Sequence, residues 1–235
     1  LLAILGDPPL ADRLEKIAYN ALPATFTPDM WAHQYDQQAN QVVVQVAEDH
    51  IYATNGPEAN IYGLAPNYGC CTANMHQGWP KFAAHLWMQT PHSGLVAWAY
   101  APCVVDTTLH GQPVHVAVRT DYPFAETVEI TVRTTQPVAF PLLLRIPGWA
   151  EDATASVGDD APQAATPGTL HRLERTWGPE TAITLRLPMR FATERRYHHS
   201  VTLTRGPLVF ALRIGEEWRL IGGEPPHGDW EVHPT

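Results

Sequence analysis

Residues 127–146 read TVEITVRTTQPVAFPLLLRI, and this stretch decides the fold class of the larger part of the chain. Apolar side chains recur at every second position on both sides of Pro137, namely at Val128, Ile130, Val132, Leu142, Leu144 and Ile146. A period of two places such side chains on one face of a β-strand. The stretch therefore predicts two strands that each bury one face.

The same alternation extends in both directions from this stretch. It recurs in residues 114–118, 183–187 and 201–203, with Pro and Gly between the runs. Strands of this kind, separated by turn residues, are typical of an antiparallel β-sandwich. Residues 151–167 are rich in Ala, Asp and Gly, and we expect them to form an exposed loop. The pattern predicts a β-sandwich over residues 91–235.

Before about residue 90 the apolar period is that of a helix. Asp7 is a good N-cap, Pro8 suits the first helical position, and Pro23 ends the pattern. The apolar face between them consists of Leu10, Leu14, Ile17, Ala18 and Ala21. Residues 1–5 have the character of the last turns of an earlier helix, so a turn at Gly6 and Asp7 predicts an αα-hairpin. A further helix is expected over residues 72–88, kinked at Pro80.

The composition excludes several classes of partner. The chain has 235 residues, with 24 acidic and 15 basic side chains and a net charge of −9. This balance argues against nucleic acid and anionic membranes, whereas a neutral sugar is compatible with it. There is no apolar run of membrane-spanning length, and three cysteines do not make a disulfide framework. Oligomeric state and compartment are left open by the sequence.

A long connection between the helices, residues 25–69, combines aromatic and amide side chains. Such a mixture suits a sugar, because aromatic rings pack on its C–H faces and amides bond its hydroxyl groups. The alternative is a packed loop whose aromatic residues are simply core. The substrate-binding candidates are His33 and Tyr35, and residues 42–46 suggest a short strand. Other members of the mixture are Trp31, Gln37, Gln38, Asn40, Asn60 and Tyr62.

Cys70 and Cys71 are adjacent, after the loop signal Asn67-Tyr68-Gly69 and at the expected start of a helix. The partial positive charge of a helix N-terminus favours thiolate, which is the form that binds zinc and attacks carbon. The alternative is a pair of buried small hydrophobic residues. Two ligands do not complete a tetrahedral zinc site, and the further candidates in the chain are His33, His76 and Glu58.

The segment NYGCCTANMHQGWPKFAAHLWM, residues 67–88, resembles glycoside hydrolase family 127 and its close relatives, the β-L-arabinofuranosidase group. The resemblance continues in WAYAPC, LLLRIPGWA, ITLRLPM and LTRGPLVFAL. It implies an α+β multidomain protein in which an (α/α)6 catalytic barrel is followed by β-sandwich domains. Residues 1–90 are then the C-terminal part of the barrel, and residues 91–235 are the sandwich.

The resemblance also implies the chemistry. In the family a Glu-x-Cys motif and the Cys pair hold a zinc ion, so Cys70 and Cys71 are the expected metal ligands here. Cys70 is the expected nucleophile of a retaining hydrolase that acts on terminal L-arabinofuranosides or similar sugars. The family's acid/base is a separate upstream Glu. The 235 residues contain no Glu-x-Cys, so we expect a C-terminal fragment that is inactive alone unless Glu58 or Asp36 acts as the acid.

Two other classes of function remain compatible with these residues. One is a non-catalytic carbohydrate-binding β-sandwich with a helical appendage. The other is a structural zinc-thiolate domain without catalysis.

Overall fold

The computed structural model describes the chain except for residues 38–40, 49–54 and 65–68, and the side chains of Thr72 and Met75. The expected site residues Gln38 and Asn40, and the loop signal at Asn67 and Tyr68, therefore lie outside the described residues. The chain divides into two compact units. The first comprises residues 1–16, 82–191 and 205–208, and the second comprises residues 17–81, 192–204 and 209–235. The sequence-based boundary between residues 90 and 91 stays a prediction.

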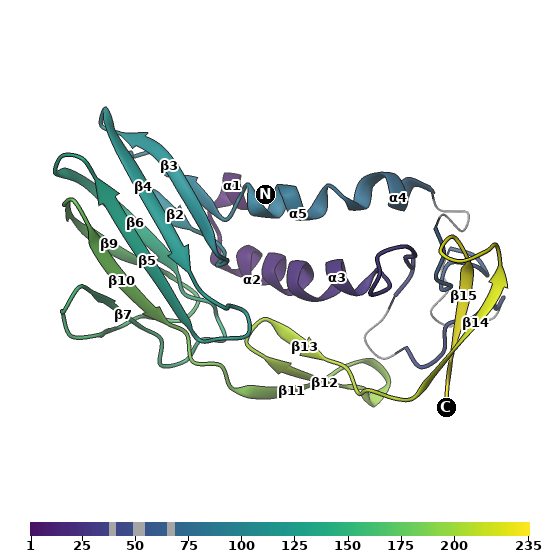
Figure 1. Ribbon diagram of the computed structural model, residues 1–235. Coiled ribbons are helices and arrows are strands. Elements are labelled where there is room, and N and C mark those ends of the chain that lie inside the picture. The colour runs from purple at the N-terminus through teal and green to yellow at the C-terminus, as the bar shows by residue number, and fades with distance from the viewer. Residues whose placement is uncertain (38–40, 49–54, 65–68) are drawn as a thin grey trace. The chain divides into compact units, whose positions relative to one another are not determined.

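The first unit is built on two stacked β-sheets (Figure 1). The larger sheet has the order β3-β4-β5-β10-β7-β8, with the bounds Cys103–Leu109, Gln112–Arg119, Thr127–Thr134, Thr181–Arg186, Thr154–Val157 and Gln163–Ala164. The smaller sheet has the order β1-β2-β6-β9, with the bounds Trp87–Gln89, Leu95–Ala97, Val138–Arg145 and Leu170–Trp177. Among the described residues of these two sheets, neighbouring strands pair in antiparallel fashion except β2 and β6, which are parallel.

The period-two residues of 114–118, 128–132, 142–146 and 183–187 form the core between these sheets, as the sequence predicts. The same expectation is wrong for Val201 and Leu203, which are exposed and lie in a different sheet. Ile130 and Leu185 of the larger sheet and Leu142 of the smaller sheet are at most 1% exposed. Ile183 stands opposite Ile130 in the register of β10 and β5, so the apolar faces of neighbouring strands coincide. The predicted β-sandwich is confirmed within the first unit, and its predicted extent to residue 235 stays a prediction.

Helices cover part of the second face of the smaller sheet. Two helices of the first unit, α1 (Leu2–Leu5) and α2 (Pro8–Lys16), bring Leu2 and Ala11 against Val96 and Trp98. Gly6 joins the helices with φ 61°, a left-handed conformation that glycine adopts without strain. The predicted turn at Gly6 and Asp7 is therefore present, and β2 is buried along its whole length.

An ion pair with no exposed surface joins α2 to β6. The guanidinium of Arg145 contacts the carboxylate of Glu15 at 2.5 Å, and both side chains are completely buried. Arg145 also pairs with Asp12 and donates from Nε to the Trp98 carbonyl at 2.5 Å. The Tyr122 hydroxyl donates to Glu15 at 2.7 Å. Burial raises the pKa of the Glu15 carboxyl, and the neighbouring guanidinium opposes that rise.

Residues 151–167 differ from the expected loop, because they contain β7 and β8. The inward positions of this segment are Ala153, Ala155 and Val157, all of them buried. Small side chains are enough here because they face the opposite sheet near the edge of the sandwich. Composition alone suggested a loop because alanine and aspartate are weak strand formers.

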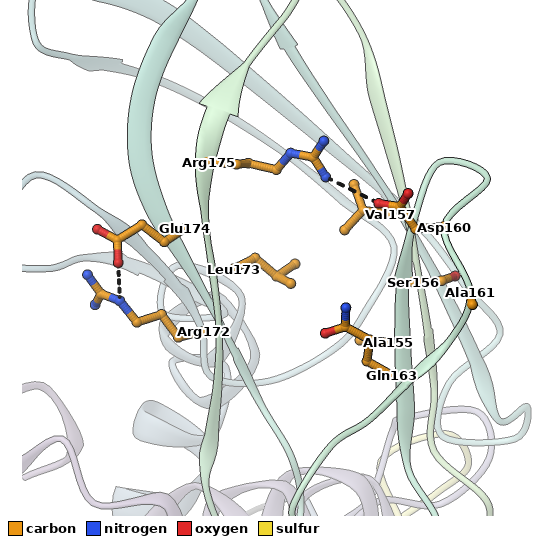
Figure 2. A pocket seen from close by; sticks show the side chains of 10 residues that line it. All are labelled: Ala155, Ser156, Val157, Asp160, Ala161, Gln163, Arg172, Leu173, Glu174 and Arg175. Atoms are coloured by element: carbon orange, nitrogen blue, oxygen red, sulfur yellow. Dashed lines mark hydrogen bonds and ion pairs between the residues drawn. The ribbon is translucent and has the colours of Figure 1, made fainter.

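The open side of the sandwich contains a cavity of about 410 Å³ between β9 and the β7–β8 edge. Figure 2 shows Leu173 and Arg175 directed from β9 into this space, with Arg175 reaching towards Asp160 at 3.9 Å. Arg172 and Glu174 point to the other side and pair with each other at 3.0 Å. An inward-directed charge on an edge strand prevents pairing with another chain, so we interpret this cavity as a protected sheet edge.

The second unit contains most of the remaining elements. A π-helical turn (Ile17–Ala21) and α3 (Leu22–Ala24) continue α2, so helical structure reaches the vicinity of Pro23 as predicted. A three-stranded sheet has the order β11-β12-β13, with the bounds Phe191–Arg195, Val201–Arg205 and Leu208–Phe210, and a 3-10 turn covers Tyr197–His199. A final hairpin pairs β14 (Glu216–Gly222) with β15 (Asp229–Pro234).

The helix expected over residues 72–88 is wrong in extent. The structure has α4 (Gly69–Met75) and α5 (Gly78–Ala83), and residues 87–89 belong to strand β1. The break falls at His76 and Gln77, so Pro80 lies in the first turn of a new helix, where it needs no hydrogen-bond donor. The helices among the described residues do not form an (α/α)6 barrel. Among the same residues, no helix has the length and apolarity needed to cross a membrane.

The long connection is attached to the C-terminal hairpin. Val44 exchanges two backbone hydrogen bonds with Val232, both of 2.8 Å. Tyr62 does the same with Trp230, at 3.0 and 2.6 Å. These are isolated bridges, so the strand expected at residues 42–46 is reduced to one paired residue. The connection is thus held to β15 at two points.

Candidate active site

Cys70 and Cys71 lie in the first turn of α4 and are both free thiols. Cys70 is exposed and Cys71 is half-buried, which argues against the alternative of two core residues. Their sulfur atoms are 4.0 Å apart. The Asn74 side chain donates to the Cys70 carbonyl oxygen at 2.7 Å, one turn further along the helix. Both thiols are therefore accessible and directed to neighbouring points.

The spacing of the two sulfurs fits a shared zinc ion. Two thiolates bound at about 2.3 Å to one tetrahedral zinc lie roughly 3.8 Å apart. The observed separation of 4.0 Å needs almost no rearrangement to reach that value. The pair supplies two of the four positions. Among the described residues, no group of three or more His, Cys, Asp or Glu side chains could hold a metal ion.

The pKa of the Cys71 thiol is raised, whereas the sequence predicts that the helix N-terminus favours the thiolate. Burial raises the pKa of the Cys71 thiol, and both the hydrogen bond and the charge of Cys70 add to this rise, as does the charge of Asp36. The expected lowering by a helix N-terminus is not found, because a helix of seven residues has a weak dipole and the neighbouring groups are negative. A nearby cation would oppose this rise in the pKa of Cys71 and favour its thiolate.

Asp36 connects the long connection to the cysteine pair, since its charge acts on Cys71. Its backbone N–H donates to the Ala59 carbonyl at 2.8 Å. Its carboxylate accepts from the Asn55 amide at 3.0 and 3.2 Å. From the sequence, Asp36 is expected only as an alternative general acid. No signal in the sequence brings it to Cys71, which lies 35 positions further along the chain.

The two predicted substrate-binding residues occupy different environments. His33 is 3% exposed, and its backbone N–H donates to the Gly63 carbonyl at 2.9 Å. Its ring meets that of Phe26 edge-on, with centroids 6.4 Å apart. Tyr35 is half-buried, one residue before Asp36. His33 thus has the packing of a structural residue, and the substrate role of both stays a prediction.

Comparison with known proteins identifies the sandwich. Residues 94–189 match the family model described as "Beta-L-arabinofuranosidase, GH127 middle domain". Residues 94–189 thus resemble a GH127 middle domain. The resemblance predicted from the sequence is confirmed at this level. The cysteine pair, His33, Tyr35 and Asp36 precede the matched residues, so the matched region does not include the candidate site. A comparison with curated protein sequences finds no match.

Solved structures share the fold of this chain. A glycoside hydrolase has a TM-score of 0.72 at 18% identity, over 99% of this chain and 46% of its own. Ara127N-Se, a GH127 β-L-arabinofuranosidase from Geobacillus stearothermophilus T6, has a TM-score of 0.68 at 16% sequence identity. The match covers 99% of this chain and 44% of that structure. The GH127 β-arabinofuranosidase BT3674 has a TM-score of 0.69 at 14% sequence identity, and the match covers 100% of this chain and 44% of that structure. The chain spans less than half the length of these structures.

Proposed function

We propose that this chain is part of a retaining glycoside hydrolase that acts on terminal L-arabinofuranosides or similar sugars. The observation that carries the proposal is the pair of accessible thiols, 4.0 Å apart, in a chain whose residues 94–189 match a GH127 middle domain. The net charge of −9 is compatible with a neutral sugar as substrate. We further propose that the helices before residue 90 belong to an (α/α)6 barrel in the complete protein.

In this proposal Cys70 is the nucleophile. Its thiolate attacks the anomeric carbon, a carbon–sulfur bond forms, and the glycosidic oxygen leaves with a proton from a general acid. Water then attacks the same carbon and displaces the sulfur, so two inversions give net retention. The greater exposure of Cys70 supports this order within the pair, because the attacking sulfur must reach the substrate.

Cys70 and Cys71 are the residues that would hold zinc. When bound, zinc keeps a coordinating thiol deprotonated at neutral pH. This matters here because the surroundings of Cys71 raise the pKa of its thiol. The remaining ligands and the general acid are not identified among the described residues. Asp36 and Glu58 are the acids of this chain that stay open for the second role.

Zinc binding is the first test. In the complete protein we expect about one zinc ion per chain, and Cys71→Ala should remove it, because a three-ligand site loses much of its affinity. Cys103→Ala is the matched control, since Cys103 lies in β3 of the sandwich and should leave the zinc content unchanged. Elemental analysis of the purified variants measures both. Full zinc content in Cys71→Ala would exclude Cys71 as a ligand.

Activity of the 235 residues alone is the second test. We expect no turnover of an aryl β-L-arabinofuranoside by this chain, assayed with zinc and reductant beside the complete protein. The reason is that the described residues offer two thiolate ligands and no complete metal group. A missing general acid alone costs about 10²–10⁴-fold. Turnover comparable to that of the complete protein would assign the acid's role to Asp36 or Glu58.

A further inference from the structure

A small pocket of about 160 Å³ lies in the second unit, between the β14–β15 hairpin and residues 41–44 of the long connection. It holds space for about five water molecules at roughly 30 Å³ each. That is room for one small ring and not for an extended chain. Its lining combines apolar and hydrogen-bonding groups, among them Gln41, Tyr62, Glu216, Trp218 and His233.

Two aromatic rings form one side of this pocket. The rings of Tyr62 and Trp218 have centroids 5.2 Å apart and are tilted by 42°. Trp230 supports Trp218 edge-on at 6.5 Å, and the two backbone hydrogen bonds between Trp230 and Tyr62 fix their strands together. Trp218 is nevertheless 37% exposed. An aromatic surface that is firmly held and still open to solvent can pack against the C–H face of a ligand.

The polar groups of the pocket are positioned as acceptors. The Gln41 amide nitrogen donates to the Val43 carbonyl at 3.1 Å and to the buried Asn60 side-chain oxygen at 2.8 Å. These two bonds fix the amide, and no hydrogen bond to its oxygen is found among the described residues. Glu216 adds a carboxylate. A ligand that satisfies both groups must carry several hydrogen-bond donors.

His233 completes the lining. Its Nε2 is bound to Glu231 at 2.9 Å, which fixes the imidazole ring and leaves Nδ1 as the other polar atom. The Tyr62 hydroxyl can both donate and accept. Burial raises the pKa of Tyr62, and the charge of Glu216 adds to this rise, so the hydroxyl stays neutral.

We propose that this pocket binds a single neutral sugar ring. Hydroxyl groups supply the donors that Gln41 and Glu216 require, and the ring's C–H face fits Trp218 and Tyr62. The carboxylate disfavours anionic sugars such as uronates. An organic cation would suit the aromatic rings and Glu216, but it would leave the Gln41 acceptor without a donor. The lining contains neither cysteine of the candidate active site, so binding here does not depend on the proposed hydrolysis.

The test follows Trp218 directly in the complete protein. In protein labelled with ¹⁵N-tryptophan, the indole resonance of Trp218 is assigned by its loss in Trp218→Phe. Titration with L-arabinose, D-galactose or D-glucose should shift this resonance saturably for at least one sugar. D-glucuronate and choline should bind at least fivefold more weakly, as judged from the concentration that half-saturates the shift. No shift with any of the three sugars, or a stronger response to choline, would overturn the proposal.

Variants test whether the Gln41 acceptor contributes to sugar binding in this pocket. Gln41→Leu keeps the shape of the side chain and removes its acceptor, and it should weaken sugar binding at least fivefold. Tyr197→Ala is the matched control, because Tyr197 is an aromatic residue with 84% exposure that does not line the pocket. Unchanged binding in Gln41→Leu would contradict the proposal. Cys70→Ala should leave the titration unaltered even where it abolishes turnover, so a failed hydrolase assignment and a failed sugar site give different results.

Discussion

Cys70→Ala in the complete protein is expected to lower turnover of an aryl β-L-arabinofuranoside by at least about 10⁴-fold, as removal of an enzyme's nucleophile does. The exposed sulfur of Cys70, 4.0 Å from that of Cys71, is the group proposed to attack the anomeric carbon. Its loss removes both the covalent step and one expected zinc ligand. Steady-state kinetics, with Cys103→Ala as the control, measure the effect.

A second measurement separates the nucleophile from the metal. A slow substrate incubated with the unmodified protein should leave one glycosyl group on the peptide that carries Cys70, detected by mass spectrometry after digestion. Zinc-free protein should give no adduct. An adduct on another residue, or turnover by Cys70→Ala above one tenth of the normal rate, would exclude Cys70 as the nucleophile and leave the cysteine pair a structural role.

Arg145→Met is expected to destabilise the first unit by about 3–5 kcal/mol, because it leaves the buried Glu15 carboxylate without its cation. Glu15 and Arg145 have no exposed side-chain surface and are 2.5 Å apart. Urea unfolding followed by tryptophan fluorescence measures the change. The double variant Glu15→Leu/Arg145→Met should recover most of the loss, since it leaves neither charge buried alone.

A matched control for this experiment lies on the surface of the same unit. Arg190 contacts Asp152 at 2.6 Å, a distance close to that of the buried pair, but both side chains are about 70% exposed. Arg190→Met should therefore cost about 1 kcal/mol or less. Equal effects of Arg145→Met and Arg190→Met would show that burial does not set the strength of the Arg145 pair.

The sandwich could be predicted because its strongest strands alternate large apolar residues. The spacing of Val128 and Ile130 predicts a buried strand face, and this prediction needs no information about neighbouring strands. The strand β7 escaped prediction because its inward residues are alanines, whose burial depends on the opposite sheet. The end of α5 escaped it because Trp87 is apolar in either period, and only pairing with Ala97 makes it a strand residue.

The candidate site was predictable in part for a similar reason. Two adjacent cysteines are visible in one line of sequence, and the structure adds their exposure and spacing. Asp36 and the buried position of His33 depend on how the long connection folds back. The pocket at Trp218 joins residues about 175 positions apart, from Gln41 to the final hairpin, and no local pattern indicates such a meeting.

The attachment of the long connection to β15 has a consequence for biosynthesis. Val46 and Glu231 are hydrogen-bonded across 185 positions, and Asn20 bonds the backbone of Val209 across 189. Residues 17–81 leave the ribosome long before these partners exist, whereas the intervening sandwich can pair its strands meanwhile. Contacts of such high sequence separation form slowly, and their apolar surfaces are open to aggregation until then. Residues 17–81 should therefore need chaperones during translation at least until residues 209–235 have emerged.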